Sequence, residues 1–141
     1  MITSDSDYFL LEIKPSTIIN AGVGIFAKAD LPAGIIVAEY RGTIFLKETK
    51  SKTVSFSDKS INLNEDCFIS GDNCAACYIN DIVNLEESKK KKKLILHSDK
   101  KYNCRFSKSH HKLFVITTDE IKEGDELFIG YGEQYWLSRW N

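Results

Sequence analysis

The side chain best placed for chemistry is a tyrosine near the end of this 141-residue chain. Tyr131 lies between two glycines at the end of the stretch Asp125–Gly132, which follows Gly124. The alternation of apolar positions predicts a short buried strand after a turn. A phenolic hydroxyl at its end could hydrogen-bond a reacting group. Taken alone, the pattern is more typical of a hairpin in which Tyr131 is a core residue.

Four cysteines offer a second kind of chemistry. Cys74 and Cys77 have the Cys-x-x-Cys spacing that occurs in zinc sites and redox pairs. A zinc site needs two further ligands, and neither Cys67 nor Cys104 has a recognised spacing to this pair. We therefore expect no metal, and we interpret the cysteines as small buried side chains.

Several other stretches combine aromatic, amide and glycine residues. A Gly-x-Gly sequence, Gly22-Val23-Gly24, is followed by the strand-like Ile25-Phe26-Ala27, so it is no dinucleotide fingerprint, which needs a helix there. Its glycines would let the backbone approach a ligand closely. Further along the chain come Glu39-Tyr40-Arg41-Gly42, Tyr78-Ile79-Asn80-Asp81 and Tyr102-Asn103-Cys104.

In this order, and with Gly130-Tyr131-Gly132 at the end, the stretches resemble the motif blocks of SET-domain protein lysine methyltransferases. The resemblance covers roughly residues 9–136. It implies one SET domain over residues 1–141, mainly β with short helices. The implied SET-domain-like (β-clip) fold has a knot-like threading of its C-terminal segment, and Asn103 matches the residue that closes it.

The implied activity is transfer of methyl groups from S-adenosylmethionine to a lysine ε-amine, leaving S-adenosylhomocysteine. No metal is needed. The partner would be a protein or peptide that carries the lysine, with a histone tail as the first expectation. Only about one lysine amine in 2,500 is neutral at pH 7, so a narrow apolar channel that disfavours the ammonium helps the reaction.

The resemblance also assigns roles to individual residues. Tyr131 would be the catalytic tyrosine, with Tyr40 a second active-site tyrosine close by. The lysine channel would be lined by Phe106, Phe128 and Ile129. The residues expected to contact the cofactor, largely through main-chain groups, are Gly22, Val23, Gly24, Ile25, Tyr78, Asn80, Asp81 and Trp136.

The chain departs from the family pattern at several positions. Asp81 stands where many members have His, and Cys77 replaces a frequent Arg. No Cys-rich tail follows Gly132 in this sequence, so we expect Tyr135 and Trp136 to cover the cofactor or the channel instead. These departures keep a second hypothesis open, a catalytically inactive SET-like module that binds a lysine-bearing peptide or a protein partner.

The elements that would position these residues are short. Runs rich in β-branched and aromatic residues, separated by Gly, Pro, Asn and Asp, predict many short strands and little helix. The expected helix covers residues 74–78. The expected strands cover residues 8–14, 35–40, 44–47, 53–56, 61–63, 67–69, 102–106 and 113–117.

Charge is distributed unevenly although the formal net charge is only −1. The run Lys89–Lys93 falls in residues 83–101, which we interpret as a polar, Lys-rich insertion loop, and we expect the run itself to be disordered. It could make a weak contact with an acidic partner or nucleic acid. The polar N-terminus and the absence of long apolar runs lead us to expect an intracellular protein without membrane contact, in the nucleus first and the cytoplasm second. We interpret the histidines as loop residues: His97, His110 and His111.

Overall fold

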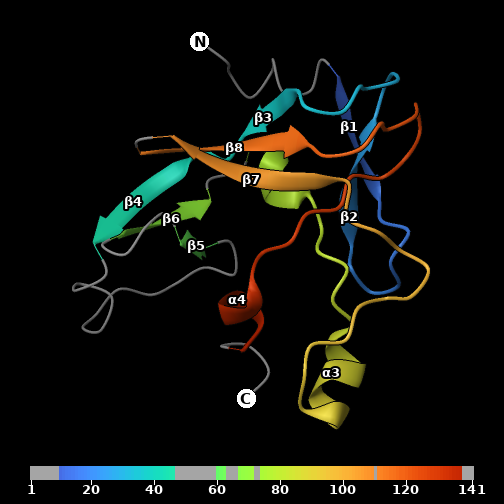
Figure 1. Cartoon of the computed structure of the whole chain (residues 1–141), viewed down its shortest axis with the longest axis vertical. Coiled ribbons are helices and arrows are strands. Elements are labelled where there is room, and N and C mark those ends of the chain that lie inside the picture. Colours follow the sequence, from blue (N-terminus) through green and yellow to red (C-terminus); the bar gives the residue numbers. More distant parts are fainter. Residues whose placement is uncertain (1–9, 47–59, 63–66, 72–73, 110, 138–141) are drawn as a thin grey trace.

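Three small antiparallel sheets form the body of the protein (Figure 1). The computed structural model describes residues 10–46, 60–62, 67–71, 74–109 and 111–137. The first sheet is a hairpin of β1 (Leu11–Pro15) and β2 (Val23–Ala27), in register from Leu11 opposite Ala27 to Pro15 opposite Val23. The mainly-β class expected from the sequence is confirmed, whereas the knot-like threading stays a prediction.

The other two sheets have three strands each. β3 (Ile36–Glu39), β8 (Lys112–Thr117) and β7 (Cys104–Ser109) form one sheet in the order β3-β8-β7. β4 (Gly42–Leu46), β6 (Cys67–Gly71) and β5 (Ser60–Asn62) form the other, in the order β4-β6-β5. Most of the expected strands are therefore confirmed within a few residues, and the one expected at 53–56 lies outside the described residues.

Two single-turn helices lie close in sequence to Asn80 and Tyr131. The expected helix at 74–78 is a 3₁₀ helix, η1 (Ala75–Tyr78), and α4 (Glu133–Leu137) follows Tyr131. η1 packs against both β2 and β3, and Figure 1 shows α4 beneath the β7–β8 sheet. The largest side chains with almost no exposed surface come from both ends of the described chain and its middle: Leu11, Ile25, Ile79, Ile82, Leu113, Val115, Ile121, Leu127 and Ile129.

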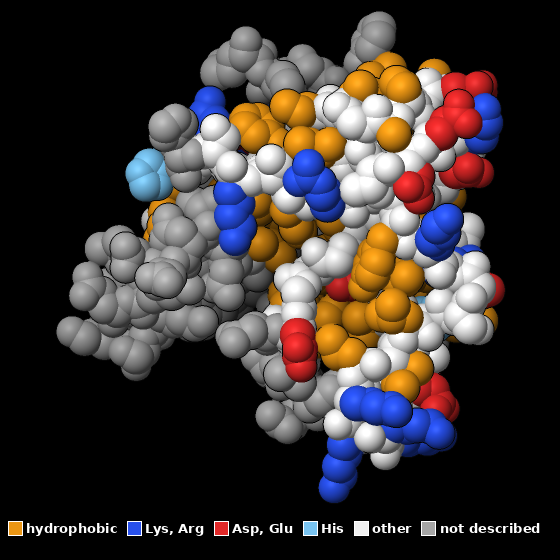
Figure 2. All heavy atoms as spheres, viewed as in Figure 1, with side chains coloured by type: hydrophobic (Ala, Val, Ile, Leu, Met, Phe, Trp, Pro, Cys, Tyr) orange, Lys and Arg blue, Asp and Glu red, His pale blue; other side chains and the backbone are white. Residues whose placement is uncertain are grey.

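Residues 83–101 were expected to form a loop with a disordered lysine run, but they contain a helix. Residues Leu85–Lys91 form the helix α3, capped at its start by the Asn84 side chain, which accepts from Glu87 N–H (3.1 Å). Acidic residues stand in its first turn and lysines in its last, the arrangement that the helix dipole favours. Capping and dipole together outweigh the repulsion within Lys89–Lys93, whose side chains are exposed at the lower end of the face in Figure 2. None of the helices in the described part of the chain has the length and apolar character of a membrane span.

The stretch 125–131 makes its backbone hydrogen bonds to three different elements. It was expected to be a strand, but it forms only isolated bridges because its partner changes along the stretch, from Phe26 to Asn80 to Cys104. The bonds run to β2, to the residue pair after η1 and to the start of β7: Ala27 N–H to Asp125 O (2.9 Å), Leu127 N–H to Ile25 O (2.8 Å), Ile129 N–H to Asn80 O (3.0 Å) and Cys104 N–H to Phe128 O (3.1 Å).

The side chain of Asn103 completes this pairing. Its Oδ1 accepts from Phe128 N–H at 2.8 Å, and its Nδ2 donates to Glu126 O at 3.0 Å. The amide thus substitutes for a strand backbone, satisfying a donor and an acceptor that would otherwise be left unpaired. Asn103 thus holds residues 126 and 128 through its side chain, and its role in a knot-like threading stays a prediction.

The carboxylate of Glu126 gives Gly24 a role other than the expected approach to a ligand. Glu126 is 5% exposed and accepts from Ser16 Oγ (2.7 Å), Thr17 N–H (2.8 Å) and Thr17 Oγ1 (2.6 Å). A Cβ on Gly24 would lie 2.2 Å from Glu126 Oε2. Gly24 is therefore required by a buried carboxylate, whereas Gly22, with φ of +74° and nothing within 4 Å of a Cβ position, faces open space.

We predict that Gly24→Ala lowers the free energy of unfolding by about 1–3 kcal/mol, the usual cost of overpacking a filled site. A double-mutant cycle measured by urea unfolding identifies the cause. The cost should persist beside Glu126→Gln, which keeps the side-chain volume, and should largely vanish beside Glu126→Ala, which removes it. An equal cost in all three backgrounds would mean that Glu126 is not what excludes a side chain at Gly24.

Candidate active site

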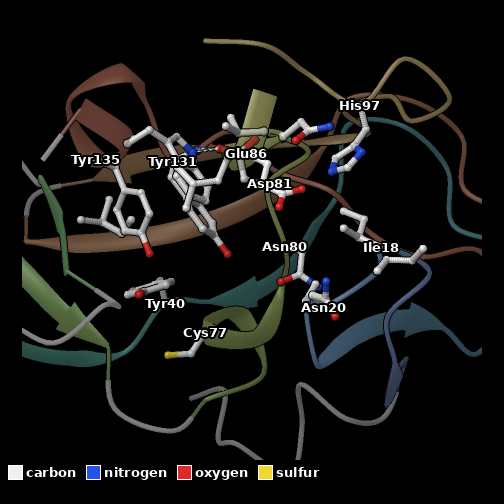
Figure 3. Close-up of a pocket in the computed structure, with 17 residues that line it drawn as sticks. Ile18, Asn20, Tyr40, Cys77, Asn80, Asp81, Glu86, His97, Tyr131 and Tyr135 are labelled. Carbon is white, nitrogen blue, oxygen red and sulfur yellow. Dashed lines mark hydrogen bonds between the residues drawn. The ribbon is translucent and has the colours of Figure 1, made fainter. Parts of the chain in front are cut away.

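A pocket of about 700 Å³ lies between the loop after β1, the segment from η1 to α3, and the C-terminal segment with α4. Its volume is in the range of small-molecule sites. Figure 3 shows Tyr40, Tyr131 and Tyr135 gathered at one end, and Ile18, Asn20 and His97 at the other. The lining residues are Ile18, Ile19, Asn20, Ala21, Tyr40, Ile61, Cys77, Asn80, Asp81, Val83, Asn84, Leu85, Glu86, His97, Tyr131, Tyr135 and Trp136.

The aromatic end of the pocket is a set of rings in mutual contact. Tyr131 meets Tyr135 edge to face, with ring centroids 4.7 Å apart, and stacks on Trp136 at 6.1 Å with 12° between the planes. Tyr40 makes an edge contact with Phe106 at 5.7 Å. Such pairings fix ring positions beyond what burial alone would do. Rings held in this way make a wall suited to an alkyl chain or a cationic methyl group.

The hydroxyl of Tyr131 donates its hydrogen to the carbonyl oxygen of Ile79. Burial, with smaller contributions from Tyr135 and Asp81, raises the pKa of Tyr131 far above the usual tyrosine range. The phenol is therefore neutral at physiological pH and its single proton is already used. What remains on the oxygen is acceptor capacity, so Tyr131 can receive a hydrogen bond from a ligand but cannot act as a phenolate base.

Tyr40 reaches the same end of the pocket from the residue after β3. It is 3% exposed, and burial, followed by the proximity of Cys77 and Tyr131, raises its pKa far above the usual tyrosine range. Both phenols predicted to be catalytic thus share one pocket and one protonation state. The environment that disfavours phenolate there disfavours any isolated charge.

Asn80 joins the two stretches that were expected to hold a cofactor. Its Nδ2 donates to Val23 O at 3.0 Å and to Glu126 Oε2 at 3.3 Å. The side chain is thus used within the protein, and it holds the start of β2, directly after Gly22, beside the pocket. Asp81 also turns its side chain inward, where it accepts from Tyr131 N–H and from Trp136 Nε1, both at 2.8 Å.

The structure brings together only part of the predicted site. Tyr40, Asn80, Asp81, Tyr131 and Trp136 line the pocket. Two more lie next to a lining residue, Val23 beside Asn80 and Phe106 beside Tyr40. Both tyrosines predicted to be catalytic thus share one cavity with three of the residues predicted to contact the cofactor.

The remaining predicted residues do not line the pocket. Ile25 and Ile129 are fully buried in the core, and Phe128 packs with Ile18 and Ile82 in a separate cluster. Gly24 abuts Glu126, and Tyr78 packs against the main core. In this structure Phe128 and Ile129 therefore support the pocket from behind.

Sequence reasoning missed one whole wall of the pocket. Residues 18–21 carry an exposed Ile19 (84%) and an Asn20 with φ of +67°, and only the second could have been suspected, because Asn tolerates the left-handed turn. His97 lies in a loop, as expected, and it also lines the pocket because its N–H donates to Ile82 O (2.8 Å) as the chain returns from α3. No local pattern signals that return.

The cysteine pair lies next to this pocket. The sulfur atoms of Cys74 and Cys77 are 3.1 Å apart, and Cys74 Sγ also accepts from Arg41 N–H at 3.2 Å. These contacts lower the pKa of the Cys74 thiol to about 6, and the contact with Cys77 contributes most. Cys104, on β7, has its pKa raised to about 12 by burial. Within the described ranges no three His, Cys, Asp or Glu side chains gather as a metal site requires.

Two comparisons with known proteins match the chain. The family model described as SET domain matches residues 22–132. Among solved structures, ATXR5 in complex with histone H3.1 carrying a mono-methylated arginine superposes with a TM-score of 0.63 at 20% sequence identity, over 88% of this chain and 57% of that one. The chain thus spans little more than half the length of that protein. No curated protein sequence matches.

We predict that Tyr40 and Tyr131 do not ionise in the native protein up to about pH 11, above the ordinary tyrosine pKa of about 10. Burial raises the pKa of both Tyr40 and Tyr131, so their protons stay bound while exposed tyrosines lose theirs. Tyrosinate absorbance should have the same amplitude below that pH in wild type, Tyr40→Phe and Tyr131→Phe. A loss of amplitude in either variant near pH 10 would contradict the assignment.

Proposed function

The chain belongs to the SET-domain family, and from this premise we propose that it is a protein-lysine N-methyltransferase. It would move methyl groups from S-adenosylmethionine to a lysine ε-amine, with a histone tail as its substrate. The observation that carries the proposal is the pairing of two neutral phenols, the buried Tyr40 and the half-buried Tyr131, at the aromatic end of one pocket.

The pocket fits S-adenosylmethionine in size and in the distribution of its lining. The aromatic end suits a methylsulfonium. The far end offers polar side chains, Asn20, Glu86 and His97, to the polar groups of a nucleoside and an amino acid. Gly22 leaves open space where a side chain would project, so the backbone of this loop can be approached closely. When bound, S-adenosylmethionine supplies an electrophilic methyl group on sulfur.

The protein's own groups would act on the lysine amine. Attack requires the neutral amine, which is a minor species in water at pH 7. A site that raises the pKa of Tyr40 and Tyr131 by burial also disfavours the ammonium, and so favours loss of its proton. Because the Tyr131 proton is committed to Ile79 O, its oxygen can accept from an amine N–H and orient the nitrogen. The rings of Tyr135 and Trp136 hold Tyr131 in position and exclude water.

A histone substrate is proposed from two supports. ATXR5, whose fold is similar, was solved in complex with a histone. Histone tails are extended, lysine-bearing chains, which suits a narrow aromatic end that admits one side chain. The lysines of α3 add an exposed basic patch away from the tyrosines, for which we propose at most a weak contact with an acidic partner.

The competing function is a module that binds a lysine-bearing peptide without methylating it. It is favoured by two substitutions in the pocket wall, Asp81 for the family's frequent His and Cys77 for its frequent Arg. The two functions differ in one observable outcome, because only an enzyme adds mass to the lysine.

We predict that the protein methylates lysine in a panel of histones and that Tyr131→Phe lowers kcat roughly 10²-fold, the usual loss on deleting one pre-oriented polar group. The affinity for S-adenosylmethionine should be nearly unchanged, since the hydroxyl acts on the amine. Mass spectrometry reads the product and calorimetry reads cofactor binding.

Ser109→Ala is the control, since it also removes one hydroxyl, from an exposed residue at the end of β7 that does not line the pocket. Its turnover should equal that of wild type. Peptide binding without any methylated product would favour the inactive module, and full turnover by Tyr131→Phe would remove this residue from the catalytic role.

A further inference from the structure

Asp81 makes more hydrogen bonds than a cofactor-contacting residue needs. It is 7% exposed, and its carboxylate accepts four hydrogen bonds. Oδ1 accepts from Ile82 N–H and from the Tyr102 hydroxyl, both at 2.6 Å. Oδ2 accepts from Tyr131 N–H and Trp136 Nε1, both at 2.8 Å. A carboxylate offers about four acceptor sites, so this one is saturated by the protein itself.

The two bonds to Oδ2 connect the catalytic segment to the C-terminal helix. Tyr131 precedes α4, and Trp136 lies within it, so one oxygen ties together two points of the chain that flank Gly132, whose φ is +99°. Trp136 also stacks on the Tyr131 ring, and Tyr135 contacts both rings. Hydrogen bonds to a charged acceptor are stronger than neutral ones, so this oxygen fixes the fold-back of α4 onto Tyr131.

We propose that Asp81 is the positioning residue that docks α4 on the pocket and thereby fixes Tyr131. The inference rests on the proposed function and deepens it, since the docked helix contributes Tyr135 and Trp136 to the wall. The His found here in many members could not do the same, because a neutral imidazole has one acceptor nitrogen and Oδ2 alone receives two donors. Asp81 does not act on substrate, because all its acceptor sites face protein donors.

Two substitutions at Asp81 separate the hydrogen bonds from the rest of the side chain. Asp81→Ala removes every acceptor. Asp81→Asn keeps one oxygen, and it should face Tyr131 N–H and Trp136 Nε1. An NH₂ group at the Oδ2 position would meet two N–H donors, whereas at the Oδ1 position it would meet only one, Ile82 N–H, beside the Tyr102 hydroxyl, which can turn and accept. The Asn variant should therefore keep α4 docked, and the Ala variant should release it.

The matched control is Tyr102→Phe, which removes one Oδ1 partner and leaves the Oδ2 bonds in place. Tyr102 does not line the pocket. A purely structural role of Asp81 predicts that Tyr102→Phe and Asp81→Ala reduce activity in proportion to their loss of stability. A positioning role predicts that only Asp81→Ala affects α4 and turnover.

The docking is read by fluorescence in a Trp140→Phe background, where Trp136 is the single tryptophan of the chain. We expect red-shifted emission in Asp81→Ala and wild-type emission in Asp81→Asn and Tyr102→Phe. The kcat of Asp81→Ala should fall roughly 10-fold or more, as misplacement of a catalytic group does. The emission readout needs no methyl transfer, so it tests the docking even if the proposed activity fails.

Unchanged emission and kcat in a folded Asp81→Ala would overturn the proposal, as would equal losses in Tyr102→Phe. Should Asp81→Ala not fold, Trp136→Phe removes one Oδ2 bond and keeps an aromatic ring. Amide exchange of residues 135–137 in that variant should then be faster than in wild type. Exchange at the wild-type rate would overturn the proposal.

Discussion

The structure depends on how the backbone of residues 125–131 satisfies its hydrogen bonds. The segment lies between elements that are distant in sequence, and it pairs with β2, with Asn80 and with the start of β7 in turn. Buried amide and carbonyl groups must be paired, so each of these partners is held in place by the same short stretch. Tyr131 is the last residue of that stretch, so the same hydrogen bonds fix where it lies.

Two buried carboxylates, those of Glu126 and Asp81, connect this segment to the pocket. Glu126, inside the segment, binds the loop after β1 through Ser16 and Thr17 and meets the Asn80 amide. Asp81, the next residue after Asn80, binds the backbone of Tyr131 and the indole of Trp136. The adjacent residues Asn80 and Asp81 thus belong to two different carboxylate networks. One holds the loop after β1, and the other holds the aromatic end of the pocket.

Local sequence patterns predicted the elements whose partners are near in sequence or whose composition is strongly biased. The hairpin of β7 and β8 and the strands around Ile61 and Ile69 followed from β-rich runs and turn residues. Tyr40, Asn80 and Tyr131 were found through their motifs, and the structure places all three around one pocket.

The remaining features depend on contacts that no local pattern contains. The stretch 125–131 has the composition of a strand but no single partner, so its pairing could not be foreseen. The lysine run was interpreted from charge alone, although Asn84 and the acidic first turn were signals of a capped helix. Gly24 was assigned to a ligand, and its actual neighbour, Glu126, could not be foreseen because it lies 102 residues away in the sequence.

The measurement that tests this account most directly is amide hydrogen exchange of the native protein. Leu127 and Ile129 should exchange only through global unfolding, as slowly as the most protected amides of β8, because their partners lie in different elements. Exchange of these two amides through a local opening, while β8 stays protected, would contradict it.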